Sequence, residues 1–336
     1  MVSGDSSTAQ SSAARSALAL LETFGSKRIL LIGDTILDVH VYGTAIGKAA
    51  ETPTIVARES STTQSLGGAF LVARNILELG GWVDMVTLVG QDEEADAVRR
   101  YGHPRFTEIA VEDLSRRTTI KKRFWVNEYK LLQFDTLDNR AISTVLMAET
   151  CDRIRQRIEG CDAVIVSDYR HGFLTPELAR EIVSLCSNVD KPLYVDSQLS
   201  QSTANHAVYF GANAFVLNLH EAQAIDSDFE QFAESPAAFD RLRTLLGAGA
   251  IVVKLGADGS SAYVNGRRFR LPGLPAHPLD TCGAGDAFLA ALSLAGLNAP
   301  HTSLLIANHW AALSTTIRGT DPPALAALRQ SFASLG

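Results

Sequence analysis

Compact apolar segments alternate with amphipathic ones along most of this chain, and the alternation limits the folds open to it. Short segments rich in Val, Ile and Leu end in Gly, Asp or Asn at residues 27–34, 84–90, 162–168, 192–196, 214–218 and 250–256. Apolar runs of this length suit strands that are buried on both faces of a parallel sheet. Amphipathic stretches such as TPELAREIVSLCS lie between them. The sequence therefore predicts an α/β fold with a doubly wound, mainly parallel sheet flanked by helices.

The polar residues that close these runs are the first place to look for chemistry. In doubly wound sheets, ligands bind beyond the carboxyl ends of the strands. We therefore expect Asp34, Asp168, Asp196 and Asn218 to lie along one rim of the sheet.

Two regions break the alternation. Residues 39–43 with 52–60, and residues 118–126 with 130–135, are predicted to form strands with no helix between them. We expect a small separate β-sheet, from about 39–65 and 116–135, that serves as a lid or as a homodimer contact. A closing lid would keep water from a reactive phosphate, and exposed strand edges favour pairing with a second copy.

Composition and the N-terminal segment narrow the class of protein. Residues 1–26 are expected to form a flexible tail and a short helix, SALALLETF, before a large domain over 27–330. A net charge of −7 argues against nucleic-acid binding. No apolar run approaches the roughly 18 residues of a membrane span, and the four cysteines form no CxxC pair. We expect a cytoplasmic protein with no membrane or nucleic-acid partner.

The segment DTCGAGDAF, residues 280–288, places small residues directly before an aspartate and an apolar helical run. Gly283, Ala284 and Gly285 at a helix N-terminus would aim backbone N–H groups at one point, which suits anionic oxygens. Asp286 beside them could accept a proton from an attacking hydroxyl. Phosphoryl transfer from ATP to an alcohol needs such an anion cradle with a base. An ordinary capped helix is the alternative, because an aspartate in the first turn complements the helix dipole.

Several motifs together resemble the PfkB, or ribokinase-like, family of sugar and nucleoside kinases. They are DTCGAGDAF, LGGAFLVARNILELGG, NLHE at 218–221 and KLGADG at 254–259, and the resemblance runs over nearly the whole chain from about residue 27. GDTILD, AETPTIV, RTTIKKR, SDYRHGFL and IANHWAAL look closest to bacterial D-glycero-β-D-manno-heptose-7-phosphate kinases. The resemblance implies a kinase domain over 27–330 that uses ATP and Mg²⁺, with no room for the fused nucleotidyltransferase of some relatives.

The resemblance also implies a role for each matching residue on the nucleotide side. Asp286 would be the general base, and the amides from Gly283 to Gly285 the anion hole. The residues implied around the nucleotide are Asn218 and Glu221, which would hold Mg²⁺ through water, Gly256 and Gly259, which would shape the pocket, and Asn308 near the adenine. An Asn and a Glu at this spacing are otherwise a common helix cap, and a helical Asn can simply pack.

On the acceptor side, the resemblance implies that Asp34 and Asp38 accept hydrogen bonds from sugar hydroxyls. Gly67 and Gly68 would let the backbone approach the sugar closely. Asp38 could equally be a turn residue, and the two glycines a tight helix entry.

The expected lid strand TTIKKRFWV carries candidate ligands for a phosphate already present on the acceptor. Strand alternation places Lys121 and Arg123 on one face, with Ile120, Lys122 and Phe124 on the other. Arg binds phosphate through two parallel hydrogen bonds and Lys adds a point charge. A solvated lid face is the alternative.

The chain departs from the family pattern at three positions. Leu71 stands where an asparagine is usual, and Asn75, one helical turn later, is a candidate to compensate. Ser197 and Gln198 stand where the heptose-phosphate subgroup often has Pro-Lys, so an expected cation is missing. Lys254, in place of the usual threonine, is our candidate to supply a replacement charge near the phosphates.

The leading hypothesis is an ATP-dependent kinase that adds a second phosphate to a phosphorylated heptose at its anomeric hydroxyl. One alternative is a PfkB-type kinase of an unphosphorylated sugar or a nucleoside. Another is an inactive sugar- or nucleotide-binding regulator, which the complete GAGD and NLHE motifs disfavour.

Overall fold

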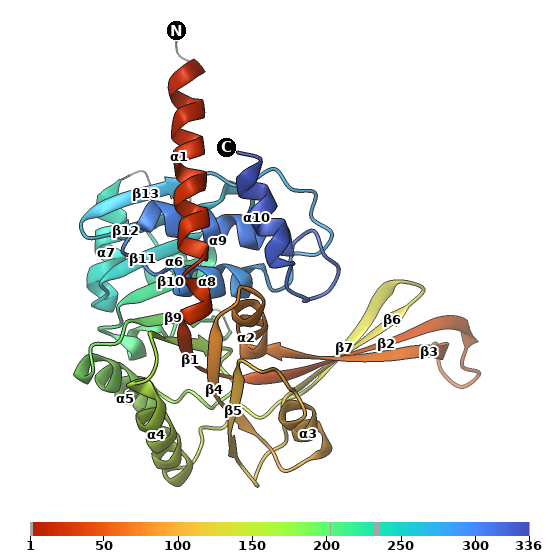
Figure 1. The fold of residues 1–336 in the computed structure, drawn as a ribbon. Coiled ribbons are helices and arrows are strands. Elements are labelled where there is room, and N and C mark those ends of the chain that lie inside the picture. Colours follow the sequence, from red (N-terminus) through yellow and green to blue (C-terminus); the bar gives the residue numbers. More distant parts are fainter. Residues whose placement is uncertain (1–2, 202, 231–234, 336) are drawn as a thin grey trace.

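A computed structural model describes residues 3–201, 203–230 and 235–335. Its central sheet has nine strands in the order β13–β12–β11–β10–β9–β8–β1–β4–β5 (Figure 1). The strands are β1 Arg28–Gly33, β4 Trp82–Val89, β5 Phe106–Glu112, β8 Ala163–Asp168, β9 Leu193–Ser197, β10 Ala214–Asn218, β11 Ala250–Lys254, β12 Ser260–Val264 and β13 Arg267–Leu271. Neighbours from β5 to β11 pair in parallel, whereas β12 and β13 are antiparallel. The predicted fold class is confirmed.

Helices cover both faces of this sheet because alternate residues of each central strand point to opposite sides. In β1, Ile29 and Leu31 belong to one apolar cluster and Leu30 and Ile32 to the other. The helices are α1 Ser3–Leu21, α2 Ala69–Glu78, α3 Glu93–Arg99, α4 Thr144–Ile158, α5 Pro176–Asn188, α6 Leu219–Ile225, α7 Pro236–Leu246, α8 Ala284–Ala295, α9 Pro300–Ser314 and α10 Leu325–Ala333, with 3₁₀ turns η1 Phe24–Ser26, η2 His206–Tyr209 and η3 Gly256–Asp258. Residues of α1, α2, α8, α9 and α10 join the first cluster, and residues of α4 to α7 join the second.

The N-terminal helix is longer than the short helix that the sequence predicts. Helix α1 already begins at Ser3 and extends beyond the body of the molecule (Figure 1). Its C-terminal half contributes Ala14, Ala17 and Leu21 to the core, against α9 and α10. This segment is therefore part of the fold. Within the described ranges, no helix is both long and apolar enough to cross a membrane.

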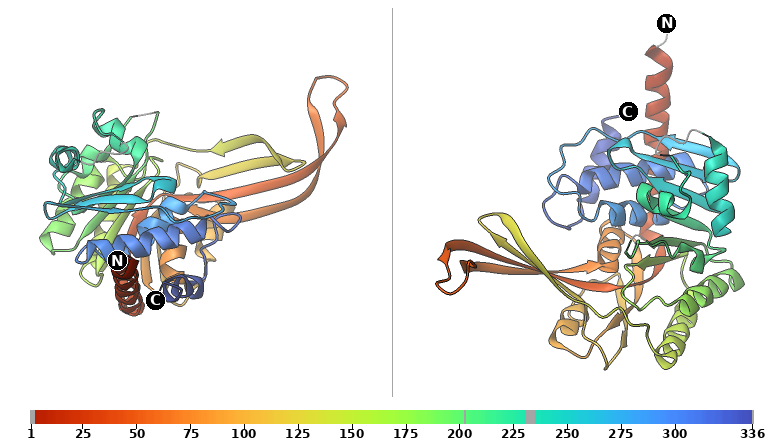
Figure 2. Two further views of the ribbon diagram at one scale, coloured as in Figure 1. Left: turned by 90° about the horizontal axis from the view of Figure 1, so that it is seen from above. Right: turned by 180° about the vertical axis from the view of Figure 1, so that it is seen from behind.

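A second sheet projects from the body as a long, curved ribbon (Figures 1 and 2). Its strands are β2 Thr35–Lys48, β3 Ile55–Gly68, β6 Ile120–Val126 and β7 Tyr129–Thr136, in the order β3–β2–β6–β7. Leu37 and Val39 are buried at its base, whereas the far end of the ribbon is exposed. The sequence prediction of a small separate sheet is confirmed, with strands longer at the base than expected.

Candidate functional site

The carboxyl ends of the central strands bring charged side chains together. Lys254 ends β11, and its Nζ donates to Oδ2 of Asp196 in β9 at 2.5 Å. Asn218 ends β10, the strand between them, in register with Lys254. Asp34 follows β1, and its Oδ2 accepts a hydrogen bond from the backbone N of Tyr169 at 2.8 Å. The strand-end residues therefore share one rim of the sheet.

Helix α8 begins inside the GAGD motif. Gly283 caps it with a φ of 79°, a conformation that favours glycine. The N–H groups of the first helical turn have no acceptor within the helix, and the helix dipole adds positive potential there. A Cβ added at Gly285 would lie 3.4 Å from Nζ of Lys254. Backbone amides and an ammonium group therefore face the same space, which suits an anion.

Asp286 lies in this first turn. The Tyr169 hydroxyl donates to its Oδ1 at 3.0 Å. Burial and the charge of Asp196 raise the pKa of Asp286 to about 7, although the Tyr169 bond and Lys254 act in the opposite direction. A carboxyl group that exchanges its proton near neutral pH is suited to general-base catalysis.

Two buried carboxyl groups lie beneath the rim. Burial, then the charge of Asp168, raises the pKa of Asp34 to about 7. Burial also raises the pKa of Asp168, whose Oδ2 accepts hydrogen bonds from Ser197 Oγ at 2.8 Å and Tyr209 Oη at 2.9 Å. Asp168 is therefore held by internal donors.

Gly67 and Gly68 are required by their neighbours in the lid hairpin. A Cβ at Gly67 would lie 2.0 Å from Oδ2 of Asp38, and one at Gly68 would lie 2.3 Å from the backbone oxygen of Asp34. Gly68 also has a φ of 63°. Both glycines therefore allow close approach, and the groups that approach them are Asp38 and Asp34, the expected sugar ligands.

The lid places two expected acceptor ligands against each other. Arg123 in β6 forms an ion pair with Asp38 in β2, because the two strands run in parallel side by side. Lys121 shares this face, and its Nζ lies 5.9 Å from the centre of the Tyr169 ring. Lys122 points to the other face, toward Val39 and Phe124. The predicted alternation holds, and the cations stand over the rim.

The structure does not place Asn75 at the acceptor side, so that expectation is wrong. Its Oδ1 accepts a hydrogen bond from Trp310 Nε1 at 2.7 Å, and its Nδ2 donates to the Leu71 backbone oxygen at 2.7 Å. Both Asn75 and Trp310 are buried. Through this contact with Trp310 of α9, the Asn75 amide serves the core.

A pocket of about 330 Å³ adjoins the GAGD turn, within the range of small-molecule sites. Its walls include Lys254, Gly256, Gly259, Gly285 and Asn308. The side-chain Nδ2 of Asn308 is buried with no hydrogen-bond partner, so it can donate to a ligand. Four predicted nucleotide-side residues and one glycine of the anion hole therefore share one pocket.

Asn218 and Glu221 form a reciprocal helix cap. Asn218 Oδ1 accepts from Glu221 N at 2.8 Å, and Glu221 Oε2 accepts from Asn218 N at 2.7 Å. Burial and Asp196 raise the pKa of Glu221 to about 7. Among the residues that the structure describes, no three His, Cys, Asp or Glu side chains cluster as direct metal ligands. The carboxylates of Asp196 and Glu221 are nevertheless oxygen donors of the kind that Mg²⁺ takes together with substrate phosphates.

Sequence reasoning missed Tyr169 and the partnership of Lys254 with Asp196. Tyr169 directly follows the strand-end Asp168, and this position was the available signal, because residues after a strand end reach the rim. Its contact with Asp286 spans 117 positions, which no local pattern reveals.

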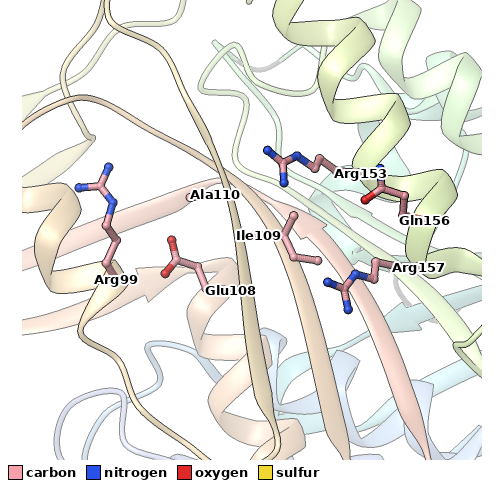
Figure 3. Close-up of a pocket in the computed structure, with 7 residues that line it drawn as sticks. All are labelled: Arg99, Glu108, Ile109, Ala110, Arg153, Gln156 and Arg157. Atoms are coloured by element: carbon pink, nitrogen blue, oxygen red, sulfur yellow. The ribbon is translucent and has the colours of Figure 1, made fainter.

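A second hollow, of about 310 Å³, lies at the edge strand β5 (Figure 3). It is lined by Arg99, Glu108, Ile109, Ala110, Arg153, Gln156 and Arg157. Each arginine there already has a carboxylate partner within 4 Å, namely Glu112 for Arg99, Glu149 for Arg153 and Asp84 for Arg157. None of the predicted site residues lines it.

The doubly wound sheet, the amide-lined GAGD turn beside Lys254 and the adjoining pocket define a phosphoryl-transfer enzyme. The model of the pfkB family of carbohydrate kinases matches residues 26–327. The chain belongs to this family and is an ATP-dependent sugar kinase.

Curated relatives are identical to this chain at about a third of the aligned positions. The chain is 33% identical over 327 residues to "Bifunctional protein HldE" of Bradyrhizobium diazoefficiens, covering 94% of this chain and 64% of that protein. It is 30% identical over 321 residues to the protein of the same name from Rhodopseudomonas palustris, covering 93% and 64%. The chain thus spans somewhat less than two thirds of these relatives.

Solved structures share the fold at low identity. Phosphofructokinase-2 from Escherichia coli in complex with potassium has a TM-score of 0.75 at 17% identity, covering 92% of this chain and 99% of that one. Ribokinase from Arabidopsis thaliana complexed with ribose and ATP has a TM-score of 0.68 at 17% identity, covering 92% and 98%.

The placement of Asn75 gives a testable prediction. Asn75→Ala should lower the free energy of unfolding by about 1–3 kcal/mol, because it leaves the buried Trp310 N–H without an acceptor. The KM for the sugar should stay unchanged. Denaturant unfolding and steady-state kinetics check both, and a raised sugar KM with unchanged stability would contradict the assignment to the core.

Proposed function

We propose that the chain transfers the γ-phosphoryl group of ATP to the anomeric hydroxyl of D-heptose 7-phosphate, giving the 1,7-bisphosphate. The observation that carries the chemistry is Asp286, with its pKa near 7, in the first turn of α8 beside Lys254. The motifs that resemble heptose-7-phosphate kinases and the relatives named HldE support the choice of acceptor.

In this proposal Asp286 takes the proton of the attacking hydroxyl. The amides of Gly283 to Gly285 and the Lys254 ammonium stabilise the negative charge that spreads over the transferred group. Asn308 donates to the nucleotide base, while Gly256 and Gly259 shape the wall of its pocket. The base and the anion-binding groups thus act from fixed positions at one helix end.

Mg²⁺ is part of the proposal, because Asp196 and Glu221 lie on the nucleotide side of the rim. When bound, Mg²⁺ would neutralise charge on the phosphates. Asn218 and Glu221 bind each other as a cap, so they would act on the ion through water. Asp196 is the nearer candidate for a direct role, since it is exposed enough to accept a ligand besides Lys254.

Asp34 and Asp38 are proposed as acceptors for sugar hydroxyls, and Lys121 and Arg123 as ligands of the acceptor phosphate. One observation favours a second candidate function, a kinase of an unphosphorylated sugar or nucleoside. Arg123 already pairs with Asp38, so the lid can neutralise its own carboxylate without a substrate phosphate. The acceptor assay below separates the two functions.

The chemistry is tested with Asp286→Asn. Turnover should fall by about 10²–10⁴-fold, because an amide cannot accept the hydroxyl proton, while ATP binding persists. The assay offers ATP·Mg²⁺ with D-heptose 7-phosphate, free heptose, fructose, ribose or adenosine, and identifies products by mass and phosphorus NMR. A bisphosphate made only by the unmodified chain supports the proposal. Turnover on a free sugar or nucleoside alone would replace the heptose-phosphate assignment, and normal turnover by the variant would exclude Asp286 as base.

The pH dependence is tested with Tyr169→Phe. The base works ionised, so the rate should rise as pH passes upward through the Asp286 pKa of about 7. The Tyr169 hydrogen bond favours the charged carboxylate. Its loss should therefore move the rising part of the pH–rate profile to higher pH by about one unit. Tyr209→Phe removes an equivalent hydroxyl from Asp168 and serves as the matched control. A pH–rate profile that is unchanged in Tyr169→Phe would exclude an effect of Tyr169 on the pKa of Asp286.

We also propose that the lid joins two copies of the chain. On the face opposite Asp38, apolar residues continue from the buried Ile120 to the exposed Leu132 and Phe134 on the edge strand β7. An exposed apolar edge of this kind favours pairing with the same surface of a second copy. The E. coli phosphofructokinase-2 neighbour has a tetrameric inhibited form, which shows that this fold can assemble.

Replacement of Leu132 and Phe134 together by glutamate should lower the molecular mass measured by analytical ultracentrifugation from that of a dimer to that of a monomer. Gln133→Lys, a change of the exposed neighbour on the other face, is the matched control and should leave the mass unchanged. A monomeric unmodified chain, or a dimer that survives the double replacement, would refute this interface.

A further inference from the structure

Arg170 has a strained backbone at the edge of the proposed site. Its φ is 64°, one of six positive values among the described non-glycine residues. Residues with long side chains rarely adopt this conformation, and backbone strain of this kind clusters at functional sites. Arg170 follows Tyr169, the partner of the base, and its backbone N donates to Oδ1 of Asp168 at 2.8 Å. The strain therefore sits two residues beyond the end of β8, on the catalytic rim.

The Arg170 side chain has an unmet hydrogen bond. Its Nη1 is buried and has no partner, and within the described residues the guanidinium forms no ion pair. Asp168 lies near but already accepts from Ser197 and Tyr209. An unsatisfied buried N–H is rare and calls for a partner. The arginine thus has a charge and a donor to offer to a molecule that the protein alone does not supply.

The neighbours of this guanidinium include a second side chain without a partner. Neither ring nitrogen of the buried His206 makes a hydrogen bond of good geometry. Burial lowers the pKa of His206 to about 4, and Asp196, Arg170 and Lys254 all act on it electrostatically. The imidazole is therefore neutral at pH 7 and can donate one hydrogen bond. His206 begins the turn η2, whose Tyr209 donates to Asp168, and the Arg170 backbone N donates to the same carboxylate, so the two side chains belong to one flank of the rim.

The sequence gives an independent reason to look for a cation here. Ser197 and Gln198 follow Asp196, so no basic side chain extends from the loop after β9. Lys254, the other candidate, is engaged with Asp196. Phosphoryl-transfer sites need several positive groups around the phosphates. Like Lys121 in the lid, Arg170 forms no ion pair among the described residues, and it is the one of the two that follows β8 in the body of the protein.

We propose that the Arg170 guanidinium, with the His206 imidazole beside it, forms a phosphate-binding subsite at the ends of β8 and β9. This inference rests on the proposed kinase function and gives a role to a residue that the resemblance left without one. The ligand is a phosphate group, and it can come from the nucleotide or from the phosphorylated acceptor. Arginine suits either because its planar fork binds two phosphate oxygens at once.

The nucleotide source is tested by calorimetric titration of the full chain with ADP and with adenosine. Arg170→Met keeps an unbranched apolar stem and removes the charge and donors. If Arg170 binds nucleotide phosphate, ADP affinity should fall by about 10- to 100-fold while adenosine affinity stays the same. Arg180→Met, on the exposed face of α5, is the matched control. An unmodified chain that binds ADP no better than adenosine would overturn the nucleotide site and exclude the nucleotide as the source of the phosphate at this subsite.

The acceptor source is tested by the KM values for D-heptose 7-phosphate and for free heptose. A KM that rises in Arg170→Met only for the phosphorylated sugar, with ADP affinity intact, assigns the subsite to the acceptor. Unchanged ADP affinity together with unchanged acceptor KM would overturn the proposal. If D-heptose 7-phosphate is not the acceptor, the ADP titration still tests the subsite at Arg170. The proposed heptose-phosphate kinase function and the proposed subsite can therefore fail independently.

A purely structural Arg170 would only offset the charges of Asp34 and Asp168, and a third variant separates that role. Arg170→Gly relieves the positive φ and should hold or raise the melting temperature, by roughly 2 °C, while weakening phosphate binding as strongly as Arg170→Met. Arg170→Lys, which keeps the charge, should restore part of the affinity. A melting temperature that falls in both charge-removing variants, with phosphate affinity intact, would show the structural role instead.

Discussion

Lys254 donates to Asp196 at the middle of a rim crowded with carboxyl groups, and charge balance at that rim constrains everything built on it. Asp34, Glu221 and Asp286 each have a pKa of about 7, because burial disfavours their charged forms and neighbouring carboxylates repel them. Lys254 opposes this rise at Glu221 and Asp286. The ion pair thereby keeps Asp286, the proposed base, ionisable near neutral pH while the ammonium remains beside the N-terminus of α8. A neutral residue at position 254 would change the charge of the rim as well as the contacts to a phosphate.

The same rim lowers the stability of the fold at neutral pH and above. A carboxyl group whose folded pKa is raised from about 4 to about 7 binds its proton more tightly in the folded state. Its contribution to stability is therefore fully present below about pH 4 and is lost as pH rises through 7. Above that pH the buried carboxylates are charged, and their repulsion opposes folding. The two apolar clusters on either face of the sheet, to which the central strands contribute on both sides, offset this penalty. Function and stability are thus opposed at one edge of the sheet.

Local patterns predicted most of the fold and the centre of the site. Strands β1, β4 and β8 to β11 could be found because burial on both faces produces continuous apolar runs, whereas the edge strand β5 and the polar hairpin β12–β13 carry no such signal. The GAGD turn could be found because its chemistry is contained in four consecutive residues. Asn75 was misassigned because helical spacing fixes a face but does not say that Trp310, 235 positions away, covers it. Tyr169 and Arg170 depend on contacts and backbone strain that only the folded chain shows.

The register of the lid links acceptor recognition to the geometry of the second sheet. Strand β2 begins directly after Asp34, so Asp38 lies in the part of this strand that is nearest the rim. Strand β6 then runs parallel to β2, which sets Lys121 opposite Asp38 and Arg123 opposite His40. A shift of one residue in this pairing would turn both cations to the apolar face that carries Leu132 and Phe134. The register that buries Leu37 and Ile120 where the lid joins the body thus also directs Lys121 to Tyr169. Tyr169 in turn donates a hydrogen bond to Asp286, the proposed general base. Packing at the root of the lid therefore determines which charges an acceptor meets at the rim.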